Sequence, residues 1–203
     1  MSVTEQRQNR VREMLQRRLS SVSVVVESVH RRHNVSAILR SAEAFGVHDV
    51  HMVTGGFRPS KGAARGSERW LQFHRHAEIT TCVRTLKEDG FQLFIADFEE
   101  GAWTPDTVPV DAPIAVLMGA ELTGVSDEAK HLADGIVTIP MPGLTSSLNV
   151  SAAAAILLHR ITTRRRAVVG GGDLPEERQE QFFQDWLERE SISRAGMLAR
   201  VRR

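Results

Sequence analysis

The sequence predicts an α/β fold with a mostly parallel sheet and helices on both faces. Short runs of β-branched and apolar residues alternate with segments in which apolar residues recur at helical spacing. Such alternation is typical of strand–helix–strand units, whose crossovers make neighbouring strands parallel. Capping residues and glycines mark many of the expected element ends. The length of 203 residues suits one well-buried core, so a single domain with appendages is expected.

The first three elements are a helix, a strand and a second helix. Residues 4–19 place apolar side chains at helical spacing and arginines on the other faces, which predicts an amphipathic helix. Residues 22–29 (VSVVVESV) are rich in β-branched residues and predict a buried strand. Asn34 can cap a helix that runs to Phe45, and Gly46 is placed to end it.

The next part of the chain contains two strands separated by a loop and a helix. Residues 50–53 predict the second strand. Residues 54–69 are basic and rich in glycine, so they predict a long loop with at most one helical turn. A helix is expected over residues 78–89, where Gly90 ends it, and the third strand over residues 91–96.

Two further strands flank a short helix. Residues 105–113 are rich in turn formers and lead into a strand at residues 114–118. Ser126, with acidic residues in the first turn after it, caps a helix that is expected to reach Ala133. A strand at residues 135–139 follows directly.

Residues 139–160 (IPMPGLTSSLNVSAAAAILLHR) join this strand to an apolar helix through a loop with free backbone groups. Serine and asparagine at the helix start can cap free amides while a ligand shares them. Because ligands of parallel sheets bind beyond the carboxyl ends of the strands, this loop is a candidate binding site. The helix is expected over residues 149–166, followed by a flexible hinge at 167–173 and an amphipathic helix at 174–190.

Positive charge is concentrated at the two ends of the chain, although the net charge is only +1. Residues 1–40 contain eight Arg and three Glu, and residues 160–203 contain ten Arg and seven acidic residues. The middle of the chain carries eight basic and fifteen acidic residues. Guanidinium groups suit bidentate phosphate contacts and base stacking, so nucleic acid is the expected partner of the ends. A genome that favours arginine codons also explains the arginine bias, but it does not explain the segregation.

Several classes of function are disfavoured. The sequence contains neither an apolar run of about 18 residues nor a signal-peptide core, so a cytoplasmic protein without a membrane anchor is expected. It also lacks the GxGxxG, GxxxxGK[ST] and GxSxG motifs. Cys82 is the single cysteine, which excludes an internal disulfide and a thiolate metal cluster. The histidines are not spaced as a ligand set, so no metal is expected, and the pairs His48/His51 and His74/His76 are expected to be solvated.

Three polar clusters punctuate the expected strand ends. Residues 34–40 (NVSAILR) place an amide at a helix start and a guanidinium one and a half turns later, although a helix cap and a surface arginine would look the same. Residues 118–124 (MGAELTG) follow a strand and allow a close backbone approach at glycine, but they also suit a simple strand-to-helix turn. Residues 139–151 form the third cluster, and a buried helix start is the alternative there.

Together and in this order, the clusters resemble the SpoU (TrmH-like) family of RNA 2′-O-ribose methyltransferases within the SPOUT superfamily. Residues 34–40 resemble the first family motif, residues 117–124 the second, and residues 139–141 with 147–151 the third. Residues 66–70 (GSERW) resemble a GS-x-x-W segment of the TrmH branch.

The resemblance implies a fold and a cofactor that composition and spacing do not reveal. It implies that the C-terminal part of the sheet is tied into a deep trefoil knot, an exception to usual chain topology. S-adenosylmethionine would be bound in this knot mainly by backbone groups, and the protein would be a homodimer with residues 149–158 near the interface. The implied cofactor-binding residues are Ala96, Met118, Gly119, Ile139, Met141 and Leu148.

The resemblance assigns the activation of the ribose hydroxyl to Arg40. A neutral guanidinium is rarely accessible in proteins, so we favour a charged Arg40 that stabilises the developing alkoxide while the proton leaves by water. Transient deprotonation of Arg40 with help from an RNA phosphate is the alternative. The other catalytic residues expected are Asn34, which orients Arg40 or the ribose, and Glu121, which fixes a loop or Arg40. Ser147 and Asn149 are expected to hold the target phosphate or the methionine end of the cofactor.

The flanks of the family segments indicate the class of RNA. We expect a basic RNA-binding extension at residues 1–20, the methyltransferase domain at 21–166 and a hinge with a basic helical extension at 167–203. Basic helical flanks of this length resemble the branch that methylates guanosine 18 in the tRNA D-loop. A ribosomal RNA 2′-O-methyltransferase and a non-catalytic knotted RNA-binding protein are the alternatives. The arginines expected to contact RNA are Arg10, Arg17, Arg18, Arg31, Arg65, Arg164, Arg165 and Arg166.

Overall fold

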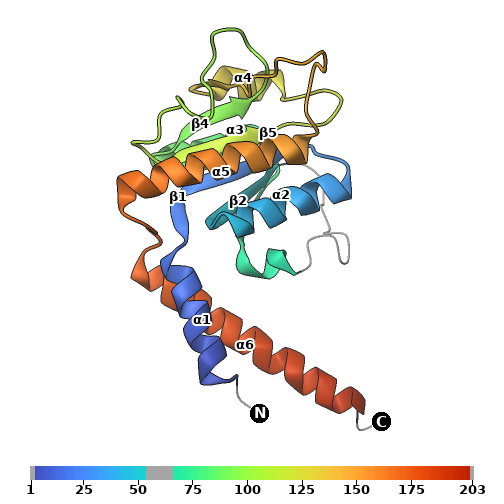
Figure 1. The fold of residues 1–203 in the computed structure, drawn as a ribbon. Helices are drawn as coiled ribbons and strands as arrows, with labels where there is room; N and C mark the ends of the chain where they lie inside the picture. The colour runs from blue at the N-terminus through green and yellow to red at the C-terminus, as the bar shows by residue number, and fades with distance from the viewer. Residues whose placement is uncertain (1–2, 54–65, 202–203) are drawn as a thin grey trace.

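A six-stranded parallel sheet forms the body of the protein (Figure 1). The computed structural model describes residues 3–53 and 66–201, with side chains up to residue 192. The strands lie in the order β3-β2-β1-β5-β4-β6, and every neighbouring pair is parallel, which confirms the predicted fold class. Their bounds are β1 Leu19–Glu27, β2 Val47–Val53, β3 Gln72–His76, β4 Gln92–Ala96, β5 Ile114–Met118 and β6 Gly135–Val137.

Six α-helices and one 3₁₀ turn are present in the described residues. Helices α2 and α5 cover one face of the sheet, and α3 and α4 cover the other (Figure 1). Helices α1 and α6 pack against each other away from the sheet. Their bounds are α1 Glu5–Gln16, α2 Arg32–Ala44, η1 Ser67–Trp70, α3 Ile79–Glu88, α4 Asp127–Leu132, α5 Val150–Val169 and α6 Glu176–Val201.

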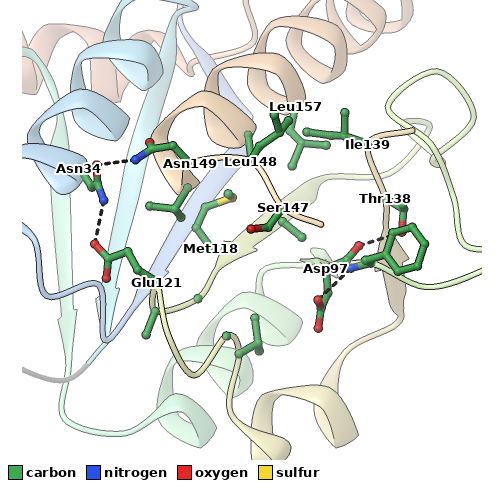
Figure 2. Close-up of a pocket in the computed structure, with 18 of the residues that line it drawn as sticks. Asn34, Asp97, Met118, Glu121, Thr138, Ile139, Ser147, Leu148, Asn149 and Leu157 are labelled. Carbon is green, nitrogen blue, oxygen red and sulfur yellow. Dashed lines mark hydrogen bonds between the residues drawn. The ribbon is translucent and has the colours of Figure 1, made fainter. Parts of the chain in front are cut away.

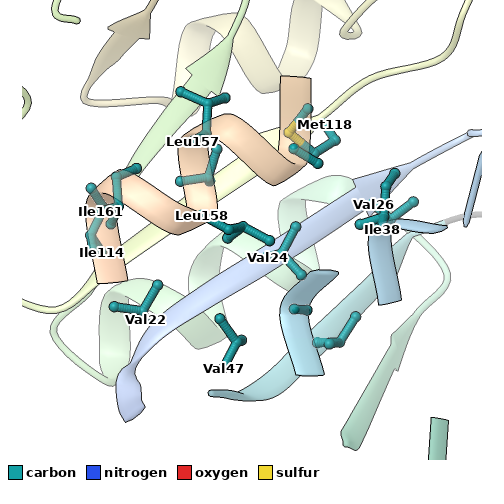
Figure 3. Packing of buried hydrophobic residues seen from close by; sticks show 14 of the residues in the cluster. Val22, Val24, Val26, Ile38, Val47, Ile114, Met118, Leu157, Leu158 and Ile161 are labelled. Atoms are coloured by element: carbon teal, nitrogen blue, oxygen red, sulfur yellow. The ribbon is translucent and has the colours of Figure 1, made fainter. Parts of the chain in front are cut away.

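Strand β1 is buried on both faces, which explains its nearly continuous apolar run. Val22, Val24 and Val26 alternate along one face and join the core beneath α2 and α5, where Leu158 packs (Figure 3). Val25 points the other way and joins the second core beneath α3 and α4. A central strand with two cores fixes the positions of the neighbouring strand ends.

Strand β3 lies at the edge of the sheet and was not expected from the sequence. Its sequence, QFHRH, is polar, and none of its five residues is fully buried. An edge strand can carry polar residues because one side of it faces solvent. The helical turn that the sequence allowed in the loop before β3 is η1, and loop residues 54–65 lie outside the described part of the chain.

Helix α5 runs to Val169, three residues further than expected, so only residues 170–173 of the expected hinge lie outside a helix. The Asp173 carboxylate accepts hydrogen bonds from the backbone amides of Ser20 at 2.6 Å and Ser21 at 3.3 Å. A side chain at Gly172 would collide with the backbone before β1. The segment therefore holds the α1/α6 pair against the start of β1.

Helices α1 and α6 share a small apolar core of their own. Phe183 and Trp186 of α6 are almost fully buried in it, against Leu15 of α1. Ion pairs join Arg7 to Glu190 at 3.2 Å and Arg12 to Glu180 at 2.6 Å.

The order and pairing of the strands do not show whether the chain is knotted, so the expected trefoil knot stays a prediction. None of the described helices is long and apolar enough to cross a membrane.

Candidate functional site

A pocket of about 430 Å³ lies beyond the carboxyl ends of β4, β5 and β6 (Figure 2). This is where parallel sheets bind ligands, and the volume is within the usual range of about 300–1,000 Å³ for small-molecule sites. The three polar clusters of the sequence all contribute to its lining. All six expected cofactor-binding residues line it, namely Ala96, Met118, Gly119, Ile139, Met141 and Leu148.

One end of the pocket is closed by a hydrogen-bonded chain of side chains from three distant segments (Figure 2). Asn34, at the start of α2, donates from Nδ2 to Glu121 Oε1 at 2.8 Å. Asn149 donates from Nδ2 to Asn34 Oδ1 at 3.1 Å. Because Asn34 is only 1% exposed, it is held in a single orientation between a carboxylate and an amide.

Glu121 is held as a carboxylate by the groups around it. Burial would raise its pKa, but the hydrogen bonds from Asn34 and from the backbone amides of His30 and Arg31 outweigh burial. The pKa of Glu121 therefore lies below its usual value. The charge fixes the start of α2 relative to the turn after β5.

The turn after β5 requires glycine at its first position. A side chain at Gly119 would place its Cβ 2.5 Å from the Gly124 carbonyl carbon and 2.6 Å from the Val125 nitrogen. Ala120 and Gly124 close the turn with reciprocal backbone hydrogen bonds of 2.9 Å. The close approach leaves backbone, rather than side chains, to form this wall of the pocket.

The loop before α5 forms the outer wall. Asn149 caps the helix, since its Oδ1 accepts from the Ser151 amide at 2.9 Å. The same side chain thus caps α5 with its oxygen and binds Asn34 with its nitrogen. Ser147 lies in the exposed part of the loop and lines the pocket, and Leu148 is 39% exposed beside it.

The opposite end of the pocket contains residues that sequence reasoning missed. Asp97 and Phe98 follow β4, and Thr138 follows β6 (Figure 2). Their positions directly after two parallel strands are the signal that could have identified them, because carboxyl ends of such strands share one edge of the sheet. Thr138 donates to the Asp97 carbonyl oxygen at 2.8 Å.

Arg40 does not line the pocket of its own chain, although Asn34 on the same helix does. Six residues of an α-helix correspond to a rotation of about 240° and a rise of about 9 Å. The two side chains therefore leave α2 on different sides, and Arg40 is exposed on its surface. The structure does not bring Arg40 together with Asn34, Glu121, Ser147 and Asn149.

The arginines expected to bind RNA divide into two groups. Arg18 and Arg165 are 1% and 7% exposed, so the prediction that they contact RNA is wrong. Arg18 donates to the Val47 carbonyl oxygen at 2.7 Å and pairs with Glu43, while Arg165 donates to two carbonyl oxygens near β5. Arg164 and Arg166 are half-buried and also donate to backbone carbonyl groups. The exposed members are Arg10, Arg17 and Arg31, and Arg65 lies outside the described residues.

The expectation of solvated histidines is wrong for His48 and His51, whereas His74 and His76 are partly exposed. His48 and His51 are 2% and 4% exposed, and burial lowers the pKa of His48 to about 4 and that of His51 to about 3. His51 Nδ1 lies 3.0 Å from His76 Nε2 in nearly parallel rings, as expected for an N–H···N hydrogen bond. His74 binds Asp49 at 2.8 Å. The Cys82 thiol is buried near His51 and His76, and burial raises its pKa to about 12.

Comparison with known proteins assigns a family to this pocket. Residues 21–159 match the model of the SpoU rRNA Methylase family, and this range contains every segment that lines the pocket. The chain belongs to the SpoU methylase family. The family resemblance seen in the sequence is thereby confirmed.

Individual relatives include SpoU proteins that act on tRNA. The tRNA (guanosine(18)-2′-O)-methyltransferase of Thermus thermophilus is 43% identical over 152 residues, covering 74% of this chain and 78% of that protein. The TrmH/SpoU tRNA modifying enzyme of A. aeolicus superposes with a TM-score of 0.83 at 29% identity, covering 92% and 97% of the two chains. The SpoU methyltransferase AviRb of Streptomyces viridochromogenes, solved with AdoMet, gives 0.63 at 25% identity, covering 76% and 64%.

Proposed function

We propose that this SpoU protein transfers a methyl group from S-adenosylmethionine to the ribose 2′-oxygen of guanosine 18 in the tRNA D-loop. The observation that carries the proposal is the convergence of three separate segments on one pocket, closed by the Glu121–Asn34–Asn149 chain. The name of the T. thermophilus relative and the likeness of the A. aeolicus enzyme along nearly the whole chain support tRNA as the substrate.

The pocket has the chemistry that S-adenosylmethionine requires. Its backbone wall at Gly119 and its apolar side chains Met118, Ile139 and Leu148 suit the adenosine part. Asn149 and Ser147 offer hydrogen bonds to the methionine end. When bound, S-adenosylmethionine supplies a methyl group activated by the sulfonium charge. The backbone wall at Gly119 carries no side-chain fingerprint for the cofactor.

Arg40 is proposed to act in the pocket of a partner subunit in a homodimer. This placement follows from its position on the side of α2 that faces away from its own pocket. Exposed apolar residues near the pocket, Leu148 at 39% and Ile156 at 40%, support an interface along α5. A charged guanidinium there would stabilise the alkoxide that forms as the ribose hydroxyl loses its proton.

The remaining polar residues are proposed to place the RNA. Asn34 and Glu121 form a rigid edge against which the target ribose can be oriented. Arg31 lines the pocket and is exposed, so it is available to a phosphate. Arg10 on α1 and Arg17 directly after it are exposed, which supports the α1/α6 pair as an RNA-binding extension outside the methyltransferase domain. We also propose a cytoplasmic location, where tRNA is modified.

Methyl transfer to defined RNAs tests this proposal. Purified protein is incubated with tritiated S-adenosylmethionine and either a tRNA transcript, the same transcript with 2′-deoxyguanosine at position 18, or ribosomal RNA. Incorporation into the first RNA alone is expected. Incorporation into ribosomal RNA but not tRNA would favour the alternative substrate, and failure to bind the cofactor by calorimetry would favour a non-catalytic RNA-binding protein.

Arg40 can be tested in the same assay. Arg40→Lys is expected to lose most turnover and to retain cofactor binding, because ammonium lacks the planar fork of guanidinium. Near-normal methylation by Arg40→Ala would contradict the assigned role. Mixed dimers test which subunit's pocket Arg40 serves. One subunit carries Arg40→Ala with an intact pocket, and the other carries the pocket variant Gly119→Val with an intact Arg40. The mixed dimer is active only if Arg40 acts in the pocket of the partner subunit.

A further inference from the structure

One buried hydroxyl fastens the wall of the pocket that follows β4 to the end of β6. Thr138 is 9% exposed and lies between Val137 and Ile139, which also line the pocket. Its Oγ1 donates to the Asp97 carbonyl oxygen at 2.8 Å and accepts from the Glu99 amide at 3.0 Å. Both capacities of the hydroxyl are therefore used by the segment that follows β4.

Backbone contacts extend the same attachment. The Thr138 amide donates to the Trp103 carbonyl oxygen at 2.7 Å, and the Trp103 amide donates to the Ile136 carbonyl oxygen at 3.1 Å. The segment from Asp97 to Trp103 is thus bound to β6 at both of its ends. The Thr138 hydroxyl binds the Asp97 end, which faces the pocket, and backbone hydrogen bonds bind the Trp103 end.

The segment carries two pocket residues whose positions are not fixed by packing. Phe98 is 69% exposed although it lines the pocket, and Asp97 is also exposed. The Phe98 amide donates to Asp97 Oδ1 at 2.8 Å, so the two residues form a local turn that moves as one unit. Two hydrogen bonds to Thr138 hold this unit against the pocket, and Figure 2 shows the one to the Asp97 carbonyl oxygen. A longer ion pair of 3.9 Å joins the Asp97 carboxylate to Lys130.

We propose that Thr138 is a positioning residue that holds the Asp97–Phe98 turn as one wall of the S-adenosylmethionine site. This inference rests on the proposed function, because it takes S-adenosylmethionine as the ligand of the pocket. Without the hydroxyl, the Asp97 carbonyl and the Glu99 amide form hydrogen bonds with water instead. The Asp97–Phe98 turn then leaves its position against the pocket. The effect falls on cofactor affinity, since Thr138 lies at the end of the pocket away from Asn34 and Glu121 (Figure 2).

Three variants separate this role from a general effect on folding. Thr138→Val removes the hydroxyl and keeps the shape, and Thr138→Ser keeps the hydroxyl. Thr162→Val is the matched control, because Thr162 is 3% exposed and its hydroxyl donates to the Leu158 carbonyl oxygen at 2.7 Å, outside the pocket lining. Affinity for S-adenosylmethionine and S-adenosylhomocysteine is measured by calorimetry without RNA, and kcat and KM are measured separately.

We expect Thr138→Val to weaken cofactor binding about tenfold, which corresponds to about 1.4 kcal/mol. Its kcat at saturating cofactor should change less than threefold, and Thr138→Ser and Thr162→Val should bind within twofold of the wild type. Wild-type affinity in Thr138→Val, or an equal loss in Thr138→Ser, would overturn the inference.

Hydrogen exchange tests the attachment without any ligand. The Glu99 amide should exchange faster in Thr138→Val than in Thr162→Val, because its acceptor is lost only in the first variant. Equal exchange in the two variants would overturn the inference even if both fold less well. A wild-type protein that binds no S-adenosylmethionine would instead refute the proposed function, so the two failures are distinguishable.

Discussion

Replacing Asn34 with alanine is expected to destabilise the protein by about 2 kcal/mol. The variant loses the 2.8 Å hydrogen bond to the Glu121 carboxylate and the 3.1 Å hydrogen bond from Asn149. A hydrogen bond to a charged group contributes about 1.5–3 kcal/mol when it is buried, and a neutral one about 0.5–1.5 kcal/mol. Glu121 is partly exposed and keeps its backbone donors, so the lower end of each range applies.

Urea denaturation followed by circular dichroism measures this loss. For a chain of this length, about 2 kcal/mol corresponds to a fall in Tm of about 4–8 °C. His33→Ala is the matched control, because His33 is exposed on the same turn of α2 and its replacement should change stability by less than about 0.5 kcal/mol. Equal stability of the two variants would refute the structural role of the hydrogen bonds that join Asn34 to Glu121 and Asn149.

The pH dependence of the loss provides a second check. The pKa of Glu121 is lowered in the folded protein, so its stabilising effect is present at neutral pH and disappears as the pH falls through the pKa of the folded state. The difference between wild type and Asn34→Ala should therefore shrink in acid. Asn34→Asp should instead be most destabilised at neutral pH, where two carboxylates face each other, and should recover as one of them takes up a proton.

Three further predictions concern the rest of the molecule. Because burial lowers the pKa of His48 to about 4, unfolding should become easier as the pH falls from about 6.5 to about 4, and His48→Phe should reduce this slope in urea titrations; an unchanged slope would contradict it. Asp173→Ala should lower the free energy of unfolding by about 2–4 kcal/mol, because the amides of Ser20 and Ser21 lose their acceptor, and a loss below about 0.5 kcal/mol would argue against the fixed turn. Ile156→Arg should weaken the proposed dimer at least tenfold in sedimentation experiments without lowering Tm, whereas an unchanged association state would remove α5 from the interface.

Local patterns in the sequence were sufficient for most of the sheet, whereas the cofactor-binding residues of the pocket came from the family resemblance. The apolar run of β1 and the caps of α4 and α5 are local signals, and the structure has all of them. The residues of the three clusters meet because parallel strands end at one edge of a sheet. Strand β3 was missed, since an edge strand of polar residues has no clear pattern. The expected Asn34 cap is wrong, because α2 begins at Arg32 and Asn34 lies inside its first turn, where its side chain binds Glu121 and Asn149.

The roles of individual arginines depended on partners that are distant in the sequence. Arg165 looks like a surface residue in a basic cluster, yet its guanidinium donates to Val110 and Asp111, more than fifty positions away. Arg18 likewise has partners that are distant in the sequence, since its buried guanidinium binds a carbonyl oxygen on β2 and the Glu43 carboxylate. No local pattern distinguishes such an arginine from one that contacts RNA.

The position of Arg40, in contrast, was available from helix geometry. A separation of six residues places it about 240° around α2 from Asn34, so the two cannot face one pocket together. A motif read as a linear string hides this rotation. The same geometry supports the proposal that Arg40 acts in the pocket of a second subunit.

The most direct test of the central claim is nucleoside mass spectrometry on tRNA and ribosomal RNA from a strain that lacks this protein. We expect 2′-O-methylguanosine at position 18 of tRNA to disappear in this strain and to return on expression of the wild-type protein but not of Arg40→Ala. Ribosomal RNA should be unchanged. Retention of the methyl group at guanosine 18, or loss of a methylated nucleotide from ribosomal RNA alone, would contradict it.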